Sequence, residues 1–121
     1  MNSTETLKIQ VCPIDDGTAG SSTMGAANRS FIIRDEDHTL GNALRYVIMK
    51  NPDVDFCGYT IPHPSESKIN FRIQSKPKAD GTIVPAIDIF SQGLKDLKEM
   101  CAIVLDKYQE TVNDFRSMET N

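Results

Sequence analysis

The last third of the chain carries an apolar repeat that is too long for a small domain to bury. From residue 87 onward, apolar residues recur at alternating intervals of three and four, and charged residues occupy most of the remaining positions. The repeat consists of Ile87, Phe90, Leu94, Leu97, Cys101, Val104, Tyr108 and, after a lapse at Thr111, Phe115. We therefore predict a helix from residue 87 to residue 115 with a heptad seam, which Met100, Ile103 and Leu105 widen.

The length of this helix predicts a partner. It would extend roughly 43 Å at ~1.5 Å per residue, whereas a compact domain of this chain length has a diameter of roughly 35 Å. Burying one large seam residue contributes roughly 1.5 to 3 kcal/mol, so several exposed ones would be a large loss beside typical domain stability. We expect a second chain to cover the overhang. The alternative is a helix that breaks near Thr111 and packs wholly on its own sheet.

The residues before this helix predict four strands within one domain. Apolar residues alternate with polar ones at 6–12 and 68–74, and residues 54–61 are rich in β-branched and aromatic side chains, which is typical of strands; SFIIR at 30–34 is a further predicted strand. We expect the strands at 54–61 and 68–74 to pair. Residues 14–28, rich in Gly, Ser, Asp and Thr, predict a mobile loop. We therefore assign residues 1–28 to a strand and loop of the same domain, 29–116 to its core and 117–121 to a tail.

A shorter amphipathic helix is predicted at residues 36–48, EDHTLGNALRYVI. Its apolar residues have helical spacing, and Asp37 or Thr39 can cap its start. Gly41 lies in the opening turns, although glycine costs about 1 kcal/mol relative to alanine inside a helix. We expect another element to pack closely there. It would be either a neighbouring helix of a partner or a crowded part of the same chain.

Composition disfavours several classes of function. The formal net charge is -4 and the basic residues are scattered, which gives no footprint for a nucleic-acid backbone. No apolar run approaches the ~20 residues that span a bilayer. Three separate cysteines suit a reducing compartment. An RNA-binding module remains the alternative from another class, since Phe56, Tyr59 and Phe71 could stack on bases.

The sequence predicts no catalytic, cofactor-binding or metal-binding residues. Asp35, Glu36, Asp37 and His38 are consecutive, so they cannot all converge on one ion from a regular element. His63 lies between two prolines without a recognisable catalytic partner. The glycines form neither GxGxxG nor GxxxxGK. A noncatalytic protein is therefore favoured.

Two segments carry a family resemblance. They resemble the small alpha-like subunit shared by eukaryotic RNA polymerases I and III. The segments are DHTLGNALRYVIMKNPDVDFCGYTIPHPSESKINFRIQS and GLKDLKEMCAIVLDKY. HTLGNALR is also similar to the polymerase II counterpart, the archaeal small alpha-like subunit and the bacterial alpha amino-terminal domain. The flanking NPDV.FC and SESK.N.RIQ favour polymerases I and III, and the polymerase II counterpart is the closest rival.

The resemblance implies an α+β fold, in which a four-stranded antiparallel sheet carries two helices on one face. It implies a noncatalytic subunit that pairs with a larger alpha-like subunit and receives the largest and second-largest catalytic subunits. Such a subunit would support synthesis of ribosomal RNA precursor, 5S rRNA and tRNA. It would be located in the nucleus, including the nucleolus. Neither cofactors, direct nucleic-acid contact nor a membrane is implied.

The resemblance also implies which residues form the dimer interface. The first helix would contribute Asp37, His38, Thr39, Leu40, Gly41, Asn42, Leu44, Arg45, Val47 and Ile48. The long helix would contribute Phe90, Leu94, Leu97, Cys101, Val104 and Tyr108. In this arrangement Gly41 and Asn42 lie where a helix of the partner crosses, and Arg45 anchors a polar contact at the edge.

Overall fold

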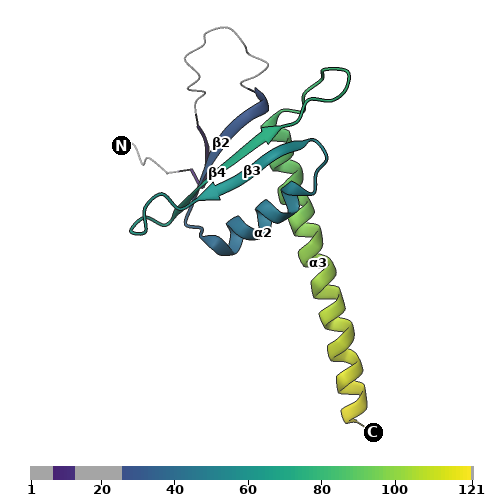
Figure 1. Cartoon of the computed structure of the whole chain (residues 1–121). Coiled ribbons are helices and arrows are strands. Elements are labelled where there is room, and N and C mark those ends of the chain that lie inside the picture. Colours follow the sequence, from purple (N-terminus) through teal and green to yellow (C-terminus); the bar gives the residue numbers. More distant parts are fainter. Residues whose placement is uncertain (1–6, 13–25, 121) are drawn as a thin grey trace, which may run out of the picture.

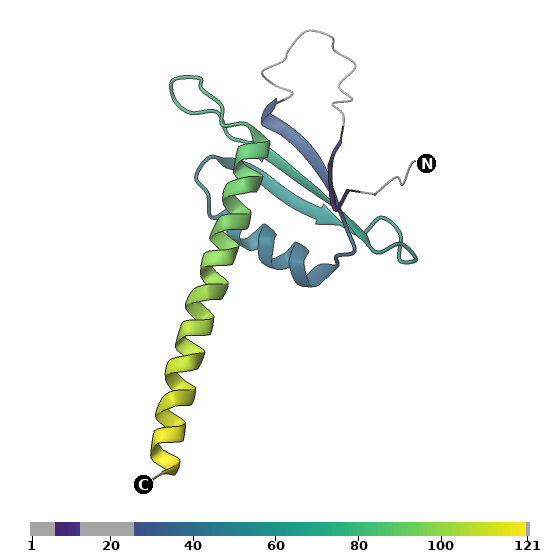
Figure 2. The same ribbon diagram turned by 180° about the vertical axis from the view of Figure 1, so that it is seen from behind.

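The computed structural model describes residues 7–12 and 26–120 (Figure 1). Its elements are β1 (Ile9–Val11), β2 (Asn28–Arg34), α2 (His38–Met49), β3 (Val54–Thr60), β4 (Lys68–Ser75) and α3 (Ala86–Glu119). The strands form one antiparallel sheet in the order β1-β2-β4-β3. Both helices lie on the same face of this sheet (Figures 1 and 2). The predicted α+β fold is confirmed.

The core lies between the helices and β2 and β4. Alternation along β4 buries Ile69, Phe71 and Ile73 completely, because successive side chains of a strand point to opposite faces. Phe71 pairs with Phe31 of β2, and the ring of Phe90 from α3 stacks on Phe31 with the centroids 4.4 Å apart. The first turns of α3 are thereby fixed to the sheet.

The two helices cross at a glycine of α3. A Cβ atom at Gly93 would lie 2.8 Å from Cδ1 of Ile48 in α2, which is closer than side chains approach. Ile48 and Leu44 are themselves buried against the sheet. The bare Gly93 therefore allows α2 and α3 to pack on each other and on the sheet at once.

Helix α3 is longer than predicted, with 34 residues, and it continues through Thr111. The predicted alternative of a break at Thr111 is therefore wrong. Its buried residues, Ala86, Ile89, Phe90 and Gly93, all lie in its first turns. The remainder projects away from the sheet (Figure 2). Ile87, predicted to begin the seam, is 51% exposed, because the core-facing spacing begins instead at Ala86 and Ile89.

The first strand is shorter and more exposed than predicted. Leu7 precedes it and is 70% exposed, and Ile9 and Val11 are 37% and 40% exposed. Ile9 pairs with Ile33, which places it on the helix-bearing face. It is nevertheless poorly covered, since the helices pack mainly over the other three strands.

The predicted loop at 14–28 falls largely on residues 13–25, which lie outside the described residues. Its predicted end is too late, because Ala27 is buried and Asn28 already begins β2.

Candidate dimerisation surface

The distal half of α3 exposes an apolar stripe that the rest of the described chain does not cover. We call it the distal α3 surface, formed by Met100, Cys101, Ile103, Val104, Leu105, Tyr108, Phe115 and Met118. Val104 is 67% exposed, and Tyr108 and Phe115 are each 60% exposed. A contiguous apolar surface of this kind marks a site of association.

The proximal part of this surface is hollowed. A groove of about 470 Å³ is lined by Leu97, Met100, Cys101, Val104, Leu105 and Tyr108. Apart from the hydroxyl of Tyr108, these side chains offer carbon and sulfur, which suits an apolar side chain of a partner more than a polar ligand.

No helix within residues 7–12 and 26–120 is long and apolar enough to cross a membrane.

The predicted heptad seam serves two purposes along one helix. Phe90 is buried in the chain's own core, and Leu94 and Leu97 are half-buried against it. Cys101, Val104 and Tyr108 continue the same spacing into solvent. Because the seam is continuous, a partner that covered the distal half would extend the chain's own core.

The predicted interface residues of α2 fall into two groups. Gly41, Leu44, Val47 and Ile48 are buried within the chain, and Leu40 is half-buried. Asp37, which precedes the helix, and His38, Thr39, Asn42 and Arg45 are exposed. The second group can touch another chain directly, whereas the first holds α2 on the sheet.

Gly41 has a close neighbour within its own chain, the ring of Tyr59. A Cβ atom there would lie 2.7 Å from Cε2 of Tyr59 on β3. The hydroxyl of Tyr59 lies 2.8 Å from Nδ1 of His38, which holds the ring over the opening turn of α2. Crowding within the chain, the predicted alternative, therefore accounts for this glycine.

Arg45 also contacts its own chain. Its Nε donates a hydrogen bond to the backbone carbonyl of Cys57 at 3.1 Å, which ties α2 to β3. Because β3 is an edge strand, this contact occupies one of the backbone acceptors that an edge would offer to another strand. The contact predicted for Arg45 at the edge of the dimer interface stays a prediction.

Two exposed apolar residues of α2 were not predicted as functional residues. Tyr46 and Met49 are 57% and 41% exposed, and Nζ of Lys50 lies 4.6 Å from the centroid of the Tyr46 ring. Their signal was available, since both are apolar residues outside the spacing of Leu44 and Ile48.

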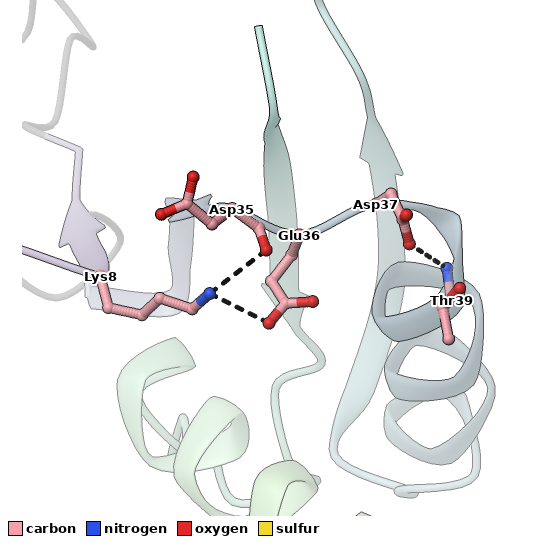
Figure 3. A network of polar contacts seen from close by, with 5 residues as sticks. All are labelled: Lys8, Asp35, Glu36, Asp37 and Thr39. Atoms are coloured by element: carbon pink, nitrogen blue, oxygen red, sulfur yellow. Dashed lines mark hydrogen bonds and ion pairs between the residues drawn. The ribbon is translucent and has the colours of Figure 1, made fainter.

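The acidic run before α2 has structural partners rather than a shared ligand (Figure 3). Nζ of Lys8 lies 3.0 Å from Oε1 of Glu36 and donates to the carbonyl of Asp35 at 3.4 Å. Asp37 caps the helix, because its Oδ1 accepts from the backbone N–H of Thr39 at 2.9 Å. That hydrogen bond lowers the pKa of Asp37. Three metal-ligating side chains converge nowhere in the described parts of the chain.

Cys57 is a core residue. It is fully buried, and burial raises the pKa of its thiol to about 12. Since the thiolate is the reactive form, this cysteine is chemically inert at neutral pH. Cys101, in the groove, is exposed.

Comparison with known families shows which family the chain belongs to. The RNA polymerase Rpb3/Rpb11 dimerisation domain matches residues 28–107, from the start of β2 into the distal half of α3. The chain belongs to this family. The match includes all of α2 and α3 up to residue 107, and therefore every groove-lining residue except Tyr108.

Curated relatives of the chain carry a narrower name. The chain is 57% identical over 81 residues to "DNA-directed RNA polymerases I and III subunit RPAC2" of Schizosaccharomyces pombe, covering 67% of this chain and 61% of the relative. The protein of the same name from Saccharomyces cerevisiae is 51% identical over 98 residues, covering 81% and 59%. That from Danio rerio is 51% identical over 90 residues, covering 74% and 76%. The resemblance found in the sequence is confirmed.

A solved structure shows the same fold. DNA-directed RNA polymerase subunit L from Thermoplasma acidophilum superimposes with a TM-score of 0.64, covering 90% of this chain and 92% of its own. The sequence identity is 16%, so this likeness concerns the fold alone.

Proposed function

We propose that this chain is a noncatalytic assembly subunit of RNA polymerases I and III. It pairs with a larger alpha-like subunit, and the pair is the platform that receives the largest and second-largest catalytic subunits. The family match and the relatives named as subunits of polymerases I and III support this assignment. The yeast relatives are matched over 61% and 59% of their length, so their remaining parts have no counterpart in the alignment.

The observation that carries the proposal is the uncovered distal α3 surface. Val104, Tyr108 and Phe115 are more than half exposed on a helix whose first turns are anchored in a complete core. Because exposed apolar area of this extent is unfavourable in water, a second chain is required to bury it. A dimerisation domain predicts such a surface.

The interface that we propose is narrower than the sequence resemblance implies. Direct contacts come from the distal α3 surface, including Cys101, Val104 and Tyr108, and from His38, Thr39, Asn42 and the exposed atoms of Arg45. Leu44, Ile48 and Phe90 act indirectly, by fixing the angle at which α2 and α3 present these residues. The chain contributes no active site, and it supports synthesis of ribosomal RNA precursor, 5S rRNA and tRNA in the nucleus and nucleolus.

Affinity purification tests this function. An affinity-tagged copy should copurify one larger alpha-like subunit together with the largest subunits of both polymerase I and polymerase III, identified by mass spectrometry. Val104→Asp should remove all of them. Recovery of the polymerase II largest subunit instead, or of no polymerase subunit, would refute the proposal.

A further inference from the structure

The face of the sheet that points away from the helices carries an exposed aromatic side chain. The pairing of β3 with β4 shifts register between Val54 and Phe56, which makes Asp55 a bulge residue. In a regular strand, Val54 and Phe56 would share one face. Here Val54 is buried among the core residues, whereas Phe56 pairs with Gln74 and is 46% exposed. The bulge therefore presents Phe56 on the outer face.

A glycine allows the ring of Phe56 to lie along the sheet. A Cβ atom at Gly58 would lie 2.8 Å from Cζ of Phe56, so the ring covers this residue. Gly58 pairs across the sheet with Arg72, whose side chain is exposed. Phe56, Arg72, Thr60 and Asn70 line a hollow of about 310 Å³. Phe and Arg side chains are both enriched at protein–protein interfaces relative to the rest of a protein surface.

The same face is basic, although the chain as a whole is acidic. The strand pairing places Arg34, Lys68 and Arg72 on it, and its paired positions in the described strands include no carboxylate. Lys68 forms an ion pair with Glu66 at 2.9 Å. Arg34 and Arg72 instead donate hydrogen bonds to neutral oxygen atoms. Two guanidinium groups on this face are therefore available to an acidic ligand.

We infer that this outer face binds an acidic segment of a second protein, with a carboxylate on Arg72 and an apolar side chain against Phe56. A protein fits better than RNA, because Tyr59 and Phe71 pack toward the helices and leave one ring for stacking. The face lies on the side of the sheet opposite α2 and α3 (Figures 1 and 2). The inference therefore does not depend on the helical partner or on the polymerase assignment.

Site-specific photocrosslinking tests this inference in the assembled complex. The full chain, expressed in cells in place of the native copy, carries p-benzoylphenylalanine at position 56 or, as a control, at position 108 on α3. The probe at 56 should form an adduct with an acidic peptide of a protein other than the one captured at 108. Arg72→Glu should lower the yield at 56 about tenfold, since like charges repel. Arg72→Lys should retain most of it.

The control position separates failure of this inference from failure of the proposed dimerisation. The yield at 108 should be the same in wild type, Arg72→Glu and Arg72→Lys, which shows that the chain still folds and assembles. In wild type, raising NaCl from about 0.1 to about 0.5 M should reduce the adduct at 56 but not that at 108. The inference would be overturned by an adduct at 56 with nucleic acid or with the partner captured at 108. It would equally be overturned if no adduct formed at 56, or if neither salt nor Arg72→Glu changed the yield there.

Discussion

The ring of Tyr59 lies against the bare Cα of Gly41, so that a Cβ atom at this position would approach Cε2 of the ring to 2.7 Å. This contact joins the opening turn of α2 to the edge strand β3. His38 and Arg45 join the same two elements through hydrogen bonds with the hydroxyl of Tyr59 and the carbonyl of Cys57. These contacts position α2 within its own domain.

Gly41→Ala should lower the free energy of unfolding by about 1–3 kcal/mol, because the added methyl group clashes with Tyr59. The gain in helix propensity of ~1 kcal/mol does not offset this clash. In a Tyr59→Ala background, Gly41→Ala should become neutral or stabilising. Asn42→Ala, at the neighbouring exposed position, is the control and should stabilise slightly. Urea denaturation of the four variants checks this, and equal stabilisation by Gly41→Ala and Asn42→Ala would contradict it.

A substitution in the core should change the stability of the chain, whereas one on the distal α3 surface should change only the binding of the partner. Leu44→Ala should lower the free energy of unfolding by about 2–5 kcal/mol, because this side chain is fully buried. Val104→Asp should leave thermal unfolding of the isolated chain unchanged but abolish copurification of the larger alpha-like subunit. Ala102→Asp is the matched control, since two residues along a helix it lies on the opposite side, and it should preserve copurification. Loss of binding in both aspartate variants would argue against a defined face.

Cys57 and Cys101 should differ in reactivity toward a thiol reagent. In variants that keep only one of them, Cys101 should react promptly at pH 8, whereas Cys57 should react only after unfolding, because its pKa is raised to about 12 by burial. Adding the larger alpha-like subunit should slow the reaction of Cys101. Prompt labelling of Cys57 in the folded chain would show that the core is open.

The cap at Asp37 should make stability depend on pH in the acid range. Its pKa is lowered from 3.8 by the hydrogen bond from Thr39, so the ionised form stabilises the fold. This contribution is fully present above the unfolded pKa and is lost as pH falls through the lower folded value. Asp37→Asn keeps an oxygen acceptor but does not titrate. The melting temperature of wild type minus that of Asp37→Asn should be constant above about pH 5. Below pH 3.8 this difference should decrease, because wild type loses the stabilising charge and the variant has no such charge to lose. A difference independent of pH would contradict the capping role.

The long helix could be predicted from the sequence because its apolar period continues far beyond the size of the domain. The division of that helix could not, since a heptad seam looks the same whether its own sheet or another chain covers it. The seam in fact enters the core at Phe90 and leaves it after Leu97. Which residues of α3 are buried and which are exposed depends on where the sheet beneath the helix ends.

The neighbours of the glycines and the direction of the Phe56 side chain could not be predicted from the sequence. A helix of a partner was expected to cross at Gly41. Within the described chain Gly41 accommodates Tyr59, and the close crossing of α2 and α3 lies at Gly93 against Ile48. Sequence alone shows that bulk is missing but not which neighbour takes the space. In a regular strand Phe56 would point to the same face as the buried Val54, and the bulge at Asp55 reverses its direction. A single inserted residue changes the face of every later side chain and leaves no clear signal in the sequence.

Amide hydrogen exchange along α3 tests the central claim most directly. In a dilute solution of the isolated chain, residues 100–118 should exchange fast while β4 exchanges slowly, because the distal helix lacks tertiary contacts. Adding the larger alpha-like subunit should slow exchange in residues 100–118 at least about tenfold and leave β4 unchanged. A complex in which residues 100–118 exchange as fast as in the isolated chain would contradict the claim that this surface is where the second subunit completes the fold.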